Sequence, residues 1–188
     1  MRKVLLFLCI SFSVLNFSQN IKGDIENQFR EYSVLIENKN FDKALDKYGN
    51  EDYFKIFPKE QVVALMNQMF NSQDVEVKIY QPQELVIGEE IIKQNNNSFL
   101  KLTYRQNLDM KFNVPGVKPE KLLSALRSEF GPNQVSYDES TRVFEIKTVK
   151  ETIANSSDLK NWKFTVIEKK QIPILIQFIP ESLLRSIN

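Results

Sequence analysis

Histidine is absent from this sequence, and cysteine occurs once, as Cys9. Cys9 lies within an apolar run near the N-terminus, where its surroundings do not suit a lipid-acceptor cysteine, so we expect it to be removed with a leader peptide. Without histidine and cysteine, the commonest nucleophile–base pairs and the usual zinc ligands are missing. We therefore expect no metal site, no cofactor and no disulfide in an exported chain that its own apolar core stabilises.

Long apolar runs are also missing, except at the N-terminus. There, Arg2 and Lys3 precede the apolar residues 4–17, and Ser18 closes the run. This pattern predicts a secretory signal peptide over residues 1–18, because the run is shorter than the roughly 20 residues that span a membrane. We expect an exported protein, periplasmic or extracellular, with a single domain over residues 19–188 and no integral membrane association after cleavage.

A strong charge of one sign is missing as well, since 25 Lys and Arg side chains stand against 24 Asp and Glu side chains. No overall field therefore favours a nucleic acid or an anionic lipid, and we predict no nucleic-acid partner. Glycine occurs only 5 times and forms no phosphate-binding loop. The carboxylates, for example Asp42 and Asp46 on one helix face, lack the spacing of a calcium loop, and we interpret them as solvated charge.

The first third of the expected domain has the apolar period of helices. Residues 21–40 carry one helical stripe, made of Ile25, Phe29, Tyr32 and Ile36. Residues 40–50 predict a second helix, which Asn40 is placed to cap and Gly49 to end. A third helix is predicted to begin at Pro58, with a stripe of Val62, Leu65, Met66 and Met69. We interpret these methionines as filler of the core.

After Ser72 the apolar period changes to two, which indicates strands. Strands are predicted at residues 75–80 and 81–92, the second broken at Gly88, and a turn at residues 93–98 leads to a third strand. This third strand, residues 99–113, has one apolar face, formed by Leu100, Leu102, Tyr104, Gln106, Leu108, Met110 and Phe112. Gln106 is the polar exception, so either a bulge turns it outward or it meets a polar group inside.

An inserted helix and a hairpin follow. A turn at Pro115-Gly116 precedes a helix predicted from Pro119 to Phe130, which Gly131 ends. Residues 134–154 then predict a hairpin that turns between Asp138 and Thr141.

The last strand holds the only tryptophan of the sequence. In residues 162–168, Trp162 shares a face with Phe164 and Val166, so we interpret it as core, with the alternative that its ring edge lines a pocket. The tail, residues 171–187, predicts a closing helix that Pro180 breaks in two.

This order of elements resembles the NTF2-like superfamily, named for nuclear transport factor 2, as an exported bacterial member. The resemblance covers Ile21 to Glu168 and includes two local patterns, ENKNFDKALDKY between the first helices and NWKF near the end. It implies an α+β fold in which a curved antiparallel sheet wraps N-terminal helices into a cone with an apolar pocket, often with a homodimer through the open sheet face. The helix from Pro119 to Phe130 and the C-terminal helix depart from this pattern, and we expect them to cap the pocket or block the dimer face.

The isomerase branch of this superfamily implies a catalytic tyrosine and an aspartate base. By count from the pattern after the first helix, Tyr32 falls at the tyrosine position and Ile56 at the position of the base. Isoleucine cannot accept a proton, so Asp52 would have to replace it through a shift of the loop. The alternative interpretation of Tyr32 is a core residue with a bonded hydroxyl.

Three functions are compatible with these sequence patterns and with the resemblance. The first is a non-catalytic protein that binds a small apolar ligand or a partner protein, and its candidate pocket residues are Tyr32, Met66, Tyr104, Gln106 and Trp162. The second is a structural or interaction module with a self-filled pocket and an exposed apolar sheet face. The third is an isomerase- or hydrolase-type enzyme, which needs a buried acid. Binding ranks first because the apolar face of the third strand carries a single amide, Gln106, as small-ligand pockets usually do. The interaction module ranks second, and the enzyme ranks third because the sequence offers no such acid.

Overall fold

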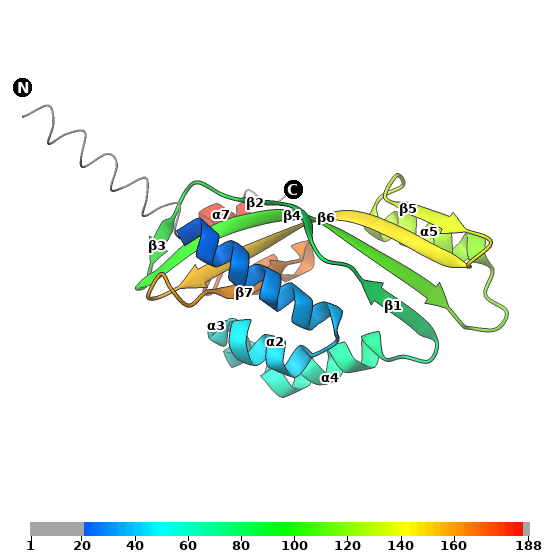
Figure 1. Cartoon of the computed structure of the whole chain (residues 1–188), viewed down its shortest axis with the longest axis horizontal. Coiled ribbons are helices and arrows are strands. Elements are labelled where there is room, and N and C mark those ends of the chain that lie inside the picture. Colours follow the sequence, from blue (N-terminus) through cyan, green and yellow to red (C-terminus); the bar gives the residue numbers. More distant parts are fainter. Residues whose placement is uncertain (1–20, 186–188) are drawn as a thin grey trace, which may run out of the picture.

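The computed structural model describes residues 21–185, so the predicted signal peptide, residues 1–18, lies outside the described residues. It shows an α+β fold in which helices cover a seven-stranded antiparallel sheet, as predicted (Figure 1). No helix of this part of the chain is both long and apolar enough to cross a membrane.

The helices follow the predicted order, with one addition. The first helix covers residues 21–37, and the others are α2 (Phe41–Tyr48), α3 (Glu51–Ile56), α4 (Lys59–Phe70), α5 (Pro119–Phe130), the 3-10 helix η1 (Lys169–Gln171), α6 (Ile172–Leu175) and α7 (Glu181–Arg185). The strands are β1 (Val75–Ile79), β2 (Gln83–Ile87), β3 (Ile92–Gln94), β4 (Asn97–Phe112), β5 (Val135–Asp138), β6 (Val143–Ser156) and β7 (Lys163–Ile167). The addition is α3, which the sequence pattern did not predict.

Two long strands, β4 and β6, form the centre of the sheet. They pair without a break from Ser98 opposite Ser156 to Met110 opposite Phe144. The other edge of β4 pairs with β1, β2 and β3, and the other edge of β6 pairs with β5 and β7. Figure 1 shows the first helix, α2, α3 and α4 towards one end of these strands, and α5 beside β5 at the other end.

The inner face of the sheet, to which the even-numbered residues of β4 point, carries the first helix. Ile25 and Phe29 of this helix are fully buried against Leu100, Leu102 and Tyr104, together with Tyr48, Trp162 and Phe164. Alternation along β4 produces this arrangement, because successive side chains of a strand point to opposite faces. The prediction that Trp162 belongs to the core is therefore confirmed, although β7 begins one residue after it.

The C-terminal helices cover part of the outer face. Leu175, Ile179, Leu183 and Leu184 pack against Phe99, Ile153 and Ile167, whose side chains point away from the first helix. As predicted, Pro180 separates two helical segments, since proline disfavours helical geometry in the residue before it. Elsewhere this face carries charged pairs, such as Lys101 with Glu151 and Arg105 with Glu84. It also exposes Val86 and Val149, and the homodimer through the sheet stays a prediction.

The inserted helix α5 has the predicted bounds. Its apolar side chains Leu122, Leu123, Leu126 and Phe130 pack against Val135, Phe144 and Ile146 at the far end of the inner face. Gly131 follows it with a φ of 108°, a conformation that favours glycine and ends the helix.

The predicted role of the α4 stripe is wrong. Leu65 and Met69 are each 56% exposed, and no residue of α4 is fully buried. Met66 and Met69 instead line a cavity, described below. An amphipathic stripe shows that a helix has an apolar side, and only the surrounding elements decide whether that side meets side chains or open space.

Two asparagines stand at helix N-termini, and they differ in their hydrogen bonds. Asn40 occupies the N-cap of α2 but makes no side-chain cap, contrary to the prediction. Asn50 caps α3, because its Oδ1 accepts a hydrogen bond of 2.9 Å from the backbone N–H of Asp52. Its buried Nδ2 also donates to Asn155 Oδ1 at 3.1 Å and to Thr165 Oγ1 at 3.2 Å.

Replacing Asn50 with alanine is expected to lower the free energy of unfolding by about 2 kcal/mol, because it removes a helix cap and leaves buried partners unsatisfied. The matched change Asn40→Ala should alter it by less than about 0.5 kcal/mol, since Asn40 is exposed and makes no cap. Urea denaturation of both variants measures the two values. Equal losses would contradict the assignment of Asn50 as the working cap.

Candidate functional site

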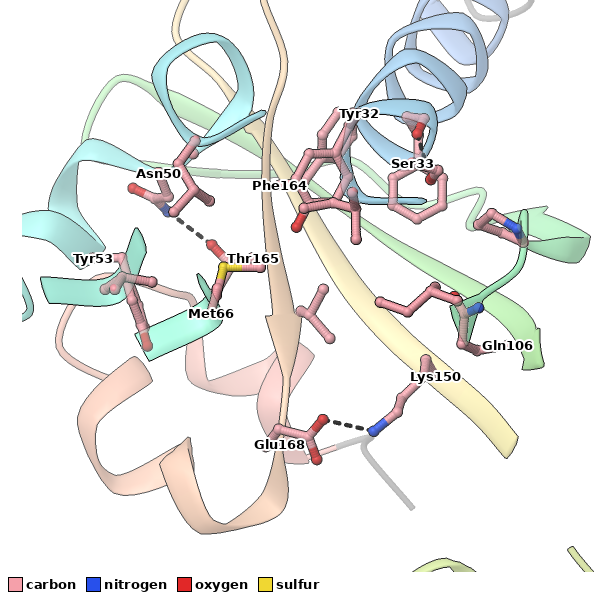
Figure 2. A pocket seen from close by; sticks show the side chains of 18 of the residues that line it. Tyr32, Ser33, Asn50, Tyr53, Met66, Gln106, Lys150, Phe164, Thr165 and Glu168 are labelled. Atoms are coloured by element: carbon pink, nitrogen blue, oxygen red, sulfur yellow. Dashed lines mark hydrogen bonds and ion pairs between the residues drawn. The ribbon is translucent and has the colours of Figure 1, made fainter. Parts of the chain in front are cut away.

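A cavity of about 430 Å³ lies between the inner face of the sheet and the helices (Figure 2). Its walls come from the first helix, α2, α3, α4, β1, β4, β6 and β7. Most of the lining side chains are apolar or aromatic, among them Ile36, Val62, Met66, Phe70, Leu108 and Phe164. Volume and lining agree with those of small-molecule sites, which usually measure about 300–1,000 Å³ and contain few polar groups.

Aromatic rings form the wall next to the core. The Phe29 ring lies 5.0 Å from the Tyr104 ring and 5.1 Å from the Phe164 ring, and Tyr32 lies 5.8 Å from Phe164, all measured between centroids. Because Phe29 itself is fully buried, these contacts hold the rings of Tyr32, Tyr104 and Phe164 in place at the cavity surface. The wall is therefore preformed.

The hydroxyl of Tyr32 makes no hydrogen bond to another described residue, so the predicted bonded hydroxyl is wrong. Burial, and secondarily the nearby Tyr104, raise the pKa of Tyr32, and burial raises the pKa of Tyr104 to about 12. Both phenols therefore stay protonated near neutral pH. Tyr32 presents an O–H group to the cavity that is free to donate to a bound molecule.

The structure decides between the two alternatives for Gln106, a bulge that turns it outward or a polar partner inside. The β4–β6 pairing continues through it without a bulge, and its Nε2 donates to the backbone carbonyls of Tyr80 at 2.7 Å and Asn107 at 2.9 Å. The amide thus meets polar groups inside, and it ties the segment after β1 to β4. Both of its donor hydrogens are engaged, which leaves its carbonyl oxygen able to accept a hydrogen bond.

One ion pair belongs to the cavity wall. Lys150 Nζ, on β6, lies 2.6 Å from Glu168 Oε1, just after β7. Figure 2 shows this pair at one end of the pocket and Tyr32 and Ser33 at the other. Neither residue was predicted from the sequence, because each is a charged position on or beside a strand with one solvent-exposed face. Only the pairing of β6 with β7 brings them together.

The residues considered for an isomerase lie elsewhere. Asp52 is not among the cavity residues and forms an ion pair of 2.6 Å with Lys55. Ile56 is an exposed residue at the end of α3. Of the described residues that line the cavity, Glu168 alone carries a carboxylate, and Lys150 neutralises it.

Four of the five candidate pocket residues come together as predicted. Tyr32, Met66, Tyr104 and Gln106 line the cavity, although they come from three separate elements. Trp162 does not line it, because its ring is enclosed in the core between the first helix and the sheet. The alternative in which its ring edge reaches the pocket is therefore wrong. No group of histidine, cysteine, aspartate and glutamate within residues 21–185 is arranged to hold a metal ion.

Comparisons with protein-family models, with curated proteins and with solved structures find no match to this chain. The resemblance to the NTF2-like superfamily consequently stays a prediction. Function has to be argued from the cavity and its residues.

Proposed function

We propose that this protein is an exported, non-catalytic binding protein of NTF2-like fold, which holds one small, largely apolar molecule in its cavity. The observation that carries the proposal is the cavity of about 430 Å³ with a mostly apolar lining. A cavity of about 150 Å³ in another protein holds benzene, so by proportion this one has room for roughly 17 non-hydrogen atoms. Burial of the apolar surface of a ligand of this size supplies the driving force for binding.

Tyr32 and α4 give this site two complementary properties. The free O–H of Tyr32, on a ring held by Phe29 and Phe164, orients a bound molecule by one hydrogen bond. Met66 and Met69 of α4 form a wall of flexible thioether side chains, which adapt to ligands of different outline. One side of the cavity is thus rigid and selective, and the other is adaptable.

Binding accounts for the described residues better than the two alternatives. An interaction module with a self-filled pocket does not fit the open cavity. The outer sheet face exposes Val86 and Val149 but also carries ion pairs, one of them made by Arg105, the cross-strand neighbour of Val149. Catalysis by proton transfer needs an acid or base with a shifted pKa inside the site, and the lining carboxylate Glu168 is half-exposed and paired.

The test is a fluorescence titration with N-phenyl-1-naphthylamine, a neutral apolar dye of about the expected size. The protein should bind one equivalent of dye. The variant Met66→Trp, which extends a lining side chain into the cavity, should weaken binding by about 5- to 150-fold, because overpacking costs about 1–3 kcal/mol.

The matched control is Leu65→Trp. Leu65 precedes Met66 on α4 but is 56% exposed and does not line the cavity, so its replacement should leave dye affinity unchanged. Absence of dye binding, or equal weakening by both variants, would overturn the proposed binding function.

A further inference from the structure

The ion pair between Lys150 and Glu168 identifies the chemistry that the bound molecule presents at one end. Of the described residues that line the cavity, these two alone carry charge. All other polar groups there are neutral, and those of Ser33, Asn50 and Gln106 already donate to other protein groups. Charge recognition in this site therefore depends on the one pair.

The two partners of this pair are held unequally. The Lys150 side chain is 22% exposed, whereas the Glu168 side chain is 52% exposed. Lys150 belongs to the central strand β6 and pairs with Tyr104 on β4. Glu168 follows the last residue of the edge strand β7 and stands at the N-cap of η1, so its side chain is free to turn towards water.

The difference in exposure between Lys150 and Glu168 determines whether the site favours an anionic or a cationic ligand. If a ligand displaces Glu168, the carboxylate moves into solvent, where it is fully hydrated at little cost. If a cationic ligand displaced Lys150, the less exposed of the two charged side chains would lose its counter-charge next to an apolar cavity, which is costlier. The site is therefore suited to an incoming anion.

We infer that the natural ligand is an apolar molecule with a carboxylate at one end, which takes the place of Glu168 on the Lys150 ammonium group while its apolar body fills the cavity. This inference rests on the proposed binding function and specifies its ligand class. A carboxylate on an ammonium group forms a charge-assisted hydrogen bond, about twice as strong as one between neutral groups. Glu168 then acts as a stand-in that keeps Lys150 paired while the cavity is vacant.

Three ligands that share the same apolar chain and differ in the head group test the inference: tetradecanoate, tetradecan-1-ol and tetradecylamine. The affinity of each is measured by displacement of N-phenyl-1-naphthylamine, below the micelle concentration of the ligand. Tetradecanoate should bind about tenfold more tightly than tetradecan-1-ol, and tetradecylamine should bind least tightly. Lys150→Met, which keeps the length of the side chain, should remove the preference for the acid over the alcohol. Glu168→Gln should strengthen tetradecanoate binding, because it removes the competing carboxylate.

Lys170→Met serves as the control, since Lys170 is close in sequence to Glu168, is 85% exposed and does not line the cavity. This variant should keep the preference for the acid. Equal binding of acid and alcohol, preference for the amine, or an acid preference that survives in Lys150→Met would overturn the inference while dye binding still supports the cavity. Failure of the dye and of all three ligands to bind would overturn the binding function itself.

Discussion

Replacing Gly49 with alanine is expected to lower the free energy of unfolding by about 3 kcal/mol, because the added methyl group has no space. A Cβ atom at this position would lie 2.4 Å from the Phe54 ring and 2.5 Å from the backbone carbonyl oxygen of Leu45. The carbonyl belongs to the last turn of α2 and accepts a hydrogen bond of 2.9 Å from the Gly49 N–H, so it cannot move without breaking the end of the helix.

Conformational freedom is not the reason for glycine here. Gly49 has a φ of −71° and a ψ of 148°, which any residue adopts. The prediction that Gly49 ends the helix is confirmed, because Gly49 is the C-cap residue of α2 and has extended geometry. The chain passes from α2 to α3 in close contact with β7, where Gly49 forms a bridge with Phe164.

Gly23→Ala is the matched control for this experiment. Gly23 lies in the first helix, and a Cβ atom added there meets nothing within 4 Å. Because alanine has the higher helix propensity by about 1 kcal/mol, this change should leave stability unchanged or raise it. Urea denaturation followed by the fluorescence of Trp162, the one tryptophan of the chain, measures both variants. A Gly49→Ala protein as stable as the parent would contradict the close packing between α2 and α3.

Replacing Trp162 with alanine is expected to cost about 3–5 kcal/mol, the range for removing a large aromatic side chain from a core. Trp162 is 1% exposed and packs within the cluster that joins the first helix to the sheet. Its backbone N–H donates to Gln28 Oε1 at 3.0 Å, and Gln28 Nε2 donates to the carbonyl of Lys160 at 2.8 Å. The first helix thus holds the loop before β7 through both the indole ring and the backbone.

The variant Trp162→Phe separates the contribution of ring volume to stability from the contribution of the indole N–H. The indole Nε1 has no hydrogen-bond partner among the described residues, so phenylalanine loses volume but no hydrogen bond. This variant should therefore cost less than half of the alanine value, as measured by urea denaturation with circular dichroism. A phenylalanine variant as unstable as the alanine variant would show that the indole N–H has a partner, contrary to the packing described above.

Local signals in the sequence were sufficient for several elements. The bounds of α5 were predicted because Pro119 and Gly131 mark its two ends, and both residues act through their own backbone geometry. The alternation of β4 was predicted because one of its faces is buried along most of its length. In contrast, α3 has 6 residues, too few to show a helical period, and the only signal for it was Asn50 followed by two acidic residues.

The candidate site was predictable only in part. Tyr32, Tyr104 and Met66 were predicted as pocket residues because apolar and aromatic residues on a buried face pack against other elements or line a cavity. Lys150 and Glu168 did not stand out, since a charged residue on a strand usually faces water. Tertiary structure places this pair at the cavity, where its partial burial turns an ordinary ion pair into a candidate recognition site.

The sequence by itself determined the order of the helices and strands apart from α3, the buried faces of the first helix and of β4, and the position of Trp162 in the core, because these follow from period, turn residues and apolar content. Tertiary structure decided that the apolar side of α4 borders an open cavity, that Gln106 is bonded to backbone carbonyls and that Lys150 meets Glu168. These features depend on the distances between elements far apart in the chain. Such distances are set by packing of the whole fold, which no local pattern encodes.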